Sequence, residues 1–217
     1  MVLGIFGASG FGREILETAN LLNEKENRWK QIIFVDDNPD LSIVADIQVY
    51  SLLKAKECFE GKLELILAIG EPSTRRKIID RANELEVPFT TLIHPDIVIP
   101  KSTKIGNGCY IGPHSFISCN VTIGEHSYIQ PNVNISHDCV LEDNVNICGM
   151  TTVAGGCYIE HDVFLGMGVS VIQCCRIGHH TIVGMGAVVH KELPEEVTAI
   201  GNPAKIIRKN TNQRVFK

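Results

Sequence analysis

The stretch IQPNVNISHDCVLEDNVNI, residues 129–147, places a branched aliphatic residue at every sixth position. The same spacing runs without a break from Ile99 to Val189. A second series, four residues further along in each repeat, contains only small residues such as Cys139 and Val145. A period of six fits neither a helix, with 3.6 residues per turn, nor a half-buried strand, with a period of 2. It is typical of a hexapeptide β-solenoid, in which each repeat supplies a short strand and a turn.

This spacing predicts the shape of a coil. The aliphatic residue must point inward, because no other position of the repeat is consistently apolar, and the small residue shares the interior. Asn107-Gly108 and Pro131-Asn132 are turn residues that suit the corners. Three hexads then close one coil of about 18 residues, and coils stack at the strand spacing of about 4.8 Å. We expect roughly five coils over residues 93–197, with residues 198–217 as a C-terminal tail.

The first 92 residues predict a different, Rossmann-like fold. Residues 2–6 form a buried strand, residues 7–12 a glycine-rich turn and residues 13–22 a helix. Strands over 31–35 and 63–69 follow, and a helix over 73–85. Such a turn lets backbone N–H groups and a helix N-terminus face a phosphate. The residues at the carboxyl ends of these strands, where ligands of parallel sheets bind, are therefore predicted to bind substrate: Gly7, Ser9, Gly10, Gly12, Asp36, Asp37 and Gly70.

This N-terminal unit is about half of a dinucleotide-binding fold. A mononucleotide or a nucleotide-sugar is therefore a better ligand for it than NAD. The alternative is that the glycines only allow close packing of helix against strand.

Composition excludes several classes of function. The chain has 217 residues and a net charge of −5, so it lacks a basic footprint for nucleic acid. No apolar stretch is long enough to span a membrane, and the N-terminus does not look like a signal peptide. Eight cysteines occur without a CxxC spacing, and four of them hold the small interior position of the repeat. We expect reduced thiols, no metal site and a cytoplasmic protein.

Several motifs occur together in one order: the glycine turn, the strand ending in Val35-Asp36-Asp37, the segment ISHDCV at 135–140, and GNPAK at 201–205. In this combination the chain resembles the hexapeptide-repeat sugar acyltransferases. That family includes UDP-4-amino-sugar N-acetyltransferases and sialic acid O-acetyltransferases.

The resemblance implies a left-handed parallel β-helix, a homotrimer, and acetyl-CoA bound between neighbouring subunits. It also implies that His137 is the general base and that Asp138 is its acidic neighbour. The chain departs from the amino-sugar enzymes at two positions, since Gln130 replaces an Asn near the reactive centre and Asn146 replaces a second His that contacts the cofactor. Gln130 is expected to bind the acceptor. The residues expected to bind the cofactor are Asn146, Gly155, Met167 and Lys205.

The residues alone do not single out His137, because other corners of the solenoid also carry histidines. His161-Asp162 is a second His-Asp pair. Residues 18 apart share an edge of the solenoid, so His137 is expected beside Gly155, where a pantetheine arm has room. His161 is expected on a crowded polar edge, between Asp143 and His179.

These features favour acetyl-CoA-dependent acetylation of the amino group of a nucleotide-linked amino sugar. Histidine suits the proton transfer, since its ordinary pKa lies near 6.5. The alternatives are sugar O-acetylation of the sialic acid type and a non-catalytic trimeric scaffold. A γ-type carbonic anhydrase would need a trio of metal-binding histidines that the spacing does not supply.

Overall fold

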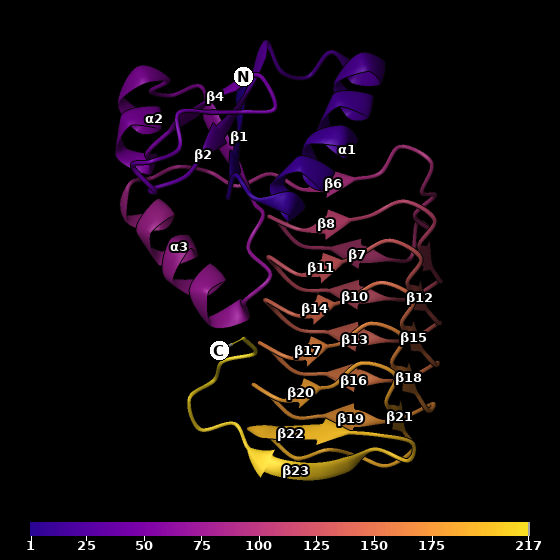
Figure 1. The fold of residues 1–217 in the computed structure, drawn as a ribbon. Coiled ribbons are helices and arrows are strands. Elements are labelled where there is room, and N and C mark those ends of the chain that lie inside the picture. The colour runs from indigo at the N-terminus through magenta and orange to yellow at the C-terminus, as the bar shows by residue number, and fades with distance from the viewer. Residues whose placement is uncertain (217) are drawn as a thin grey trace.

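The computed structural model describes residues 1–216, which form an α/β domain followed by a three-sided solenoid (Figure 1). The α/β domain is a five-stranded sheet in the order β3-β4-β2-β1-β5, flanked by three helices. Strands β1, β2 and β5 are parallel neighbours. The elements of this domain are β1 (Val2–Phe6), α1 (Gly10–Glu26), β2 (Gln31–Val35), β3 (Ile43–Val44), β4 (Ile47–Tyr50), α2 (Leu52–Cys58), β5 (Leu63–Leu67) and α3 (Pro72–Glu84).

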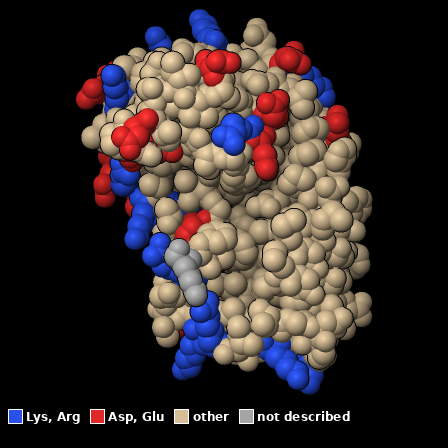
Figure 2. Space-filling model, in the orientation of Figure 1, with Lys and Arg blue, Asp and Glu red and all other residues tan. Residues whose placement is uncertain are grey.

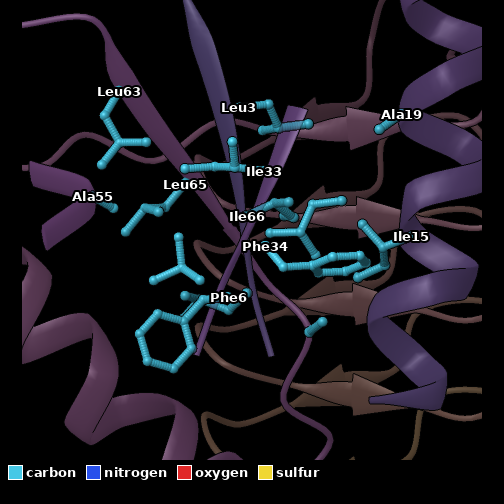
Figure 3. Packing of buried hydrophobic residues seen from close by; sticks show 14 of the residues in the cluster. Leu3, Phe6, Ile15, Ala19, Ile33, Phe34, Ala55, Leu63, Leu65 and Ile66 are labelled. Atoms are coloured by element: carbon cyan, nitrogen blue, oxygen red, sulfur yellow. The ribbon is translucent and has the colours of Figure 1, made fainter. Parts of the chain in front are cut away.

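The core of this domain lies on both faces of the central strands, against helix α1 on one side and against α2 and α3 on the other (Figure 3). All five residues of β1 are buried, and α1 buries the face that carries Ile15 and Ala19. A Cβ atom added at Gly12 would lie 2.0 Å from the carbonyl oxygen of Gly7. Glycine at 12 is therefore required for the close approach of α1 to the turn, which supports the packing interpretation of this one glycine.

The predicted elements are present, with differences at their ends. Helix α1 starts three residues earlier and ends four later than the predicted 13–22, and β5 ends two residues before Ile69. The hairpin of β3 and β4 and the helix α2 were not predicted. Their apolar positions are too few to give a clear period.

The solenoid consists of three sheets of parallel two-residue strands, and one of these sheets ends in two longer strands, the last of them antiparallel. We name each sheet by one member. The β10 sheet contains β7 (Lys104–Ile105), β10 (Thr122–Ile123), β13 (Val140–Leu141), β16 (Tyr158–Ile159) and β19 (Arg176–Ile177). The β11 sheet contains β6 (Leu92–Ile93), β8 (Tyr110–Ile111), β11 (Tyr128–Ile129), β14 (Asn146–Ile147), β17 (Phe164–Leu165), β20 (Ile182–Val183), β22 (Val197–Ile200) and β23 (Lys205–Lys209). The β12 sheet contains β9 (Phe116–Ile117), β12 (Asn134–Ile135), β15 (Thr152–Val153), β18 (Ser170–Val171) and β21 (Val188–Val189).

The coil length matches the prediction. Ile123 pairs with Leu141, and Leu141 with Ile159, so neighbouring coils are 18 residues apart. The aliphatic series fills the interior from Ile111 onward together with the small series. From Gly108 to Gly186 the second corner residue of each repeat takes a left-handed backbone conformation, for example Asn132 at φ 59° and Asp138 at φ 60°. Asn, Asp and Gly tolerate this conformation best, and they hold nine of these fourteen positions.

Five of the eight cysteines are buried, and Cys58, Cys119 and Cys174 are exposed. All eight lie within the described residues and are free thiols. The thiols of Cys139 and Cys157 each donate to a backbone carbonyl 15 residues further on, both at 3.1 Å. Burial raises the pKa of the interior Cys109 thiol to about 12, so this thiol stays protonated.

The end of the chain returns to the domain boundary. Strand β22 pairs with β20, so the predicted tail begins within the β11 sheet, and β23 pairs antiparallel with β22. The backbone N–H groups of Val215 and Phe216 then donate to the buried carboxylate of Glu71. Lys217, the last residue of the predicted tail, lies outside the described residues. Within residues 1–216 no helix has the length and apolarity needed to cross a bilayer.

Candidate active site

His137 and Asp138 form a hydrogen-bonded pair at the corner between β12 and β13. His137 Nδ1 lies 2.7 Å from Asp138 Oδ2, and the two side chains are 63% and 56% exposed. Hydrogen bonds from His137 and from Asn120 lower the pKa of Asp138. An ionised carboxylate only accepts hydrogen bonds, so in the neutral form of the ring Nδ1 carries the proton and Nε2 keeps a free lone pair. This is the arrangement that a general base needs.

Gly155 lies directly against the His137 ring, as the coil spacing predicts. A Cβ atom added at Gly155 would lie 2.6 Å from His137 Cε1 and 2.8 Å from Nε2. The absence of a side chain at 155 therefore lets the ring lie along the edge of the solenoid. We call this corner column, which contains Asn120, Asp138 and Gly155, the His137 edge.

Gly155→Ala is expected to lower kcat by roughly tenfold, because the new methyl group must displace the His137 ring and small misplacements of a base are costly. The His137 side chain is exposed and can move, so the unfolding free energy is expected to change by less than about 0.5 kcal/mol. Steady-state kinetics together with urea unfolding check both parts. Unchanged kcat would show that the ring position observed here is not the working one.

The second pair, His161 and Asp162, has the same spacing but a different environment. Its Nδ1 to Oδ2 distance is also 2.7 Å, while the Asp162 side chain is only 3% exposed. Arg76 from α3 donates to both carboxylate oxygens, at 3.1 and 2.6 Å. Burial alone would raise the pKa of Asp162, but the hydrogen bonds from Arg76, His161 and Asn144 lower it overall. This pair therefore joins the α/β domain to the solenoid.

The surroundings of His161 agree with the predicted crowded edge. Its ring stacks on His179, with centroids 4.9 Å apart, beside an open pocket of about 590 Å³. Ligand atoms of His161, Asp162 and His180 all lie within 4.8 Å of one another. A metal ion there would have to compete with the guanidinium of Arg76 for both oxygens of Asp162, so the ion pair is the better occupant.

The predicted nucleotide residues meet at one end of the α/β sheet. Gly7, Asp36 and Gly70 lie just after β1, β2 and β5, which are adjacent strands. Asp36 Oδ2 accepts a hydrogen bond of 3.0 Å from the N–H of Ala8, so this carboxylate holds the glycine turn. Ser9 and Gly10 are exposed at the N-terminus of α1. An exposed helix N-terminus favours an anionic group such as a phosphate.

The carboxylate of Asp37 already has two partners within the α/β domain. Its Oδ1 accepts from the backbone N–H of Leu52, and its Oδ2 pairs with Arg81 at 2.8 Å. Both Asp37 and Arg81 remain partly exposed, so a ligand would compete with a weak surface pair.

The residues predicted to bind the cofactor lie in separate parts of the chain. Asn146 is buried on the outer face of β14, where Oδ1 accepts from Arg75. Met167 is 54% exposed at the corner between β17 and β18, and Lys205 is exposed on β23. Gln130, which was predicted to bind the acceptor, accepts at Oε1 from the N–H of Gly149 at 3.3 Å. Within a single chain, Gly155 is the only one of these predicted residues that lies against His137.

The residues that join the two domains were not predicted from the sequence. The guanidinium of Arg75 is fully buried, stacks on Tyr128 and donates to Ile69 O, Asn144 Oδ1, Asn144 O and Asn146 Oδ1. The sequence carried a signal, since the outward position of every third hexad is aromatic or aliphatic in four of five successive coils. In the structure these positions are buried under the α/β domain or the C-terminal segment. These positions are Tyr110, Tyr128, Asn146, Phe164 and Ile182.

The hexapeptide solenoid, its exposed His-Asp pair and the nucleotide-type α/β domain together define a transferase of the hexapeptide class. The PglD N-terminal domain family matches residues 2–82, and the bacterial transferase hexapeptide family matches residues 120–155 and 156–191. No curated protein matches the chain.

Solved structures resemble the whole chain. PerB from Caulobacter crescentus, in complex with CoA and GDP-perosamine, is 30% identical, with a TM-score of 0.88 and coverage of 96% of this chain and 98% of that one. WeeI from Acinetobacter baumannii AYE is 29% identical, with coverage of 95% and 100% and a TM-score of 0.89. The acetyltransferase domain of PglB from Neisseria gonorrhoeae FA1090 is 26% identical, with coverage of 95% and 99% and a TM-score of 0.87.

The chain belongs to the hexapeptide-repeat sugar acyltransferase family. It is an acyltransferase, and its solenoid is the left-handed parallel β-helix of that family.

Proposed function

We propose that this enzyme transfers the acetyl group of acetyl-CoA to the amino group of a nucleotide-linked amino sugar. The single observation that carries the proposal is the exposed His137–Asp138 pair beside Gly155. The similar structures support it, since they include a perosamine N-acetyltransferase with CoA and GDP-perosamine and an acetyltransferase domain with acetyl-CoA. The free thiols of the chain suit the cytoplasm, where thiols stay reduced.

The chemistry follows from the free lone pair on Nε2 of His137. The acceptor amine attacks the thioester carbonyl carbon, and Nε2 takes the proton that the amine loses. Asp138 stabilises the resulting imidazolium through Nδ1. The carbon–sulfur bond then breaks, the amide is complete, and the imidazolium returns its proton to the CoA thiolate.

The two substrates bind at different parts of the chain in this proposal. The nucleotide lies at the carboxyl end of the α/β sheet, on the Gly7 turn and Asp36, with Gln130 nearby on the solenoid. The pantetheine arm of acetyl-CoA passes along the His137 edge beside the His137 ring, which occupies the space over Gly155, and Met167 contributes from a neighbouring chain.

A homotrimer brings these parts together. The α/β domain packs on the β11 sheet (Figure 1). His137 follows β12 and precedes β13, so it lies at the corner between the other two sheets. A neighbouring subunit must therefore supply the nucleotide domain to each His137. The outward residues of the β12 sheet carry no charge: Phe116, Asn134, Thr152, Ser170 and Val188. Charged side chains gather instead on the α/β domain and at the far end of the solenoid in the face that Figure 2 shows. An uncharged face with exposed apolar side chains suits a subunit interface.

We expect light scattering at micromolar concentration to give three times the chain mass of 23.9 kDa. Phe116→Lys puts a charge on the uncharged face and is expected to shift the mass toward the monomer, whereas Lys104→Ala on the β10 sheet leaves the trimer intact. A monomer for the unaltered protein would contradict the proposed assembly.

Asp36→Ala is expected to raise KM for the nucleotide-sugar and to leave KM for acetyl-CoA nearly unchanged, because Asp36 holds the turn that faces the nucleotide. Asp40→Ala is the matched control, since Asp40 is an exposed carboxylate four residues away. Steady-state kinetics with each substrate varied in turn measure both constants. Equal increases in the two KM values would remove the argument for separate sites.

The reaction itself is tested by incubating the purified protein with acetyl-CoA and nucleotide-linked amino sugars and following the release of CoA thiol. Matched sugars with a hydroxyl group in place of the amine separate N-acetylation from O-acetylation. Thiol release only with the hydroxyl sugars would favour an O-acetyltransferase, and no release with either would favour a scaffold.

A further inference from the structure

The His137–Asp138 pair continues into a third side chain, that of Asn120. Asn120 Nδ2 donates to Asp138 Oδ1 at 3.1 Å, while Asp138 Oδ2 faces His137 Nδ1 at 2.7 Å. Each oxygen of the carboxylate therefore has its own partner. Asn120 lies one coil before Asp138 on the His137 edge, and its own N–H donates to the hydroxyl of Ser102 at 3.1 Å. This contact fixes the backbone from which the amide reaches Asp138.

The same chain of three residues occurs a second time in this protein. Asn144 lies 18 residues before Asp162, its Nδ2 donates to Asp162 Oδ1, and Asp162 Oδ2 faces His161 Nδ1. The backbone is the same in both copies, since φ is 56° at Asn120 and 60° at Asn144. It is 60° at Asp138 and 59° at Asp162. A corner residue in the left-handed backbone conformation thus places the side-chain amide of an Asn over the carboxylate of the Asp one coil later.

The two copies differ in what else holds the carboxylate. Arg76 donates to both oxygens of the buried Asp162 and would hold this carboxylate without the hydrogen bond from Asn144. For the exposed Asp138, among the described residues, Asn120 is the only side-chain hydrogen-bond partner besides His137. An exposed carboxylate with one partner is free to rotate about its side-chain torsions. The amide is what restricts Asp138 to the rotamer that meets His137.

We propose that Asn120 is a positioning residue of the acetyl transfer, which holds Asp138 so that His137 keeps its proton on Nδ1 and its lone pair on Nε2. The inference rests on the proposed function of His137 as the base. Asn120 does not touch either substrate in this scheme and acts only through Asp138.

The test uses Asn120→Gly, because glycine accepts the left-handed conformation without strain and removes only the amide. We expect kcat to fall by roughly 3- to 10-fold, the effect of one net hydrogen bond, with KM for acetyl-CoA unchanged. Asn120→Asp keeps the shape but replaces the donor with a second carboxylate, so we expect a larger fall. Asn132→Gly is the matched control, since Asn132 is exposed, has φ 59° and lies on another edge. It is expected to keep wild-type kcat.

A second measurement reports on the ring itself. Histidine labelled with ¹⁵N shows which nitrogen carries the proton at about pH 8.5, where an ordinary imidazole is neutral. The signal of His137 is assigned by its loss in His137→Gln. We expect Nδ1 to carry the proton in the unaltered protein, and a mixture of both forms in Asn120→Gly.

The two measurements separate the possible failures. If the unaltered protein releases no thiol with any acceptor, the proposed function fails, while the nitrogen shifts still test the role of Asn120. If Asn120→Gly keeps kcat within twofold of wild type and His137 keeps a single form, Asn120 is not a positioning residue. A fall in kcat that Asn132→Gly shares equally would also overturn the proposal, because it would then reflect the turn and not the amide.

Discussion

His137→Ala is expected to lower kcat by roughly 10²- to 10⁴-fold, the usual range for the loss of a general base. The ring offers a free Nε2 at an open edge of the solenoid, and Asp138 fixes the proton on Nδ1. KM for acetyl-CoA is expected to change little, since the base acts mainly on the transition state. The fold is expected to survive, because the side chain is 63% exposed and the interior series is untouched. Initial rates of thiol release and far-UV circular dichroism check the two parts.

His161→Ala is the internal control for this prediction, since it removes the other His-Asp pair. Asp162 keeps its hydrogen bonds from Arg76 and Asn144, so the junction is expected to hold and most of the activity to remain. If His161→Ala abolishes activity while His137→Ala keeps most of it, the base has been assigned to the wrong edge. The catalytic edge would then lie one third of a turn around the solenoid.

Arg75→Met is expected to lower the free energy of unfolding by about 2–4 kcal/mol. Methionine keeps much of the apolar stem over Tyr128 but leaves the buried acceptors of Asn144, Asn146 and Ile69 without their donor. Each unsatisfied buried group costs about 1–3 kcal/mol. Burial also lowers the pKa of Arg75, so releasing this buried charge offsets part of the loss. Urea unfolding followed by circular dichroism measures the difference.

Arg81→Ala is the control on the same helix. The Arg81–Asp37 pair is 44% and 38% exposed, and such surface pairs contribute about 0.2–1 kcal/mol. Its loss is therefore expected to change the unfolding free energy much less than Arg75→Met. Equal effects of the two substitutions would show that the Arg75 junction does not stabilise the fold.

The solenoid could be predicted from the sequence because its period is strict and each repeat contacts only the coils beside it. All sixteen positions of this period from Ile99 to Val189 are aliphatic, so each of them indicates the same six-residue repeat. The central strands of the α/β domain could be predicted for a similar reason, since β1 is an unbroken run of buried residues. Helix α2 spans only seven residues and buries Leu52 and Ala55, too few for a visible period.

The candidate site could be predicted only in part, because the contacts that distinguish its two His-Asp pairs join residues that are far apart in the chain. His137 and His161 each precede an aspartate and have the same local geometry. What separates them is Arg76, which is 86 residues away from Asp162 in the chain. The use of Asn146 as a partner of Arg75 likewise depends on how the α/β domain packs on the β11 sheet. The 18-residue spacing did predict that Gly155 lies beside His137, since that contact is set within the repeat.

The most direct measurement is acetyl transfer by the purified protein to a panel of UDP- and GDP-linked amino sugars, with release of CoA thiol and the mass of the product followed together. We predict thiol release that depends on the acceptor, a product that gains one acetyl group on nitrogen, and loss of both signals in His137→Ala. Thiol release that is equally fast in His137→Ala, or none above background with any amino sugar, would contradict this function.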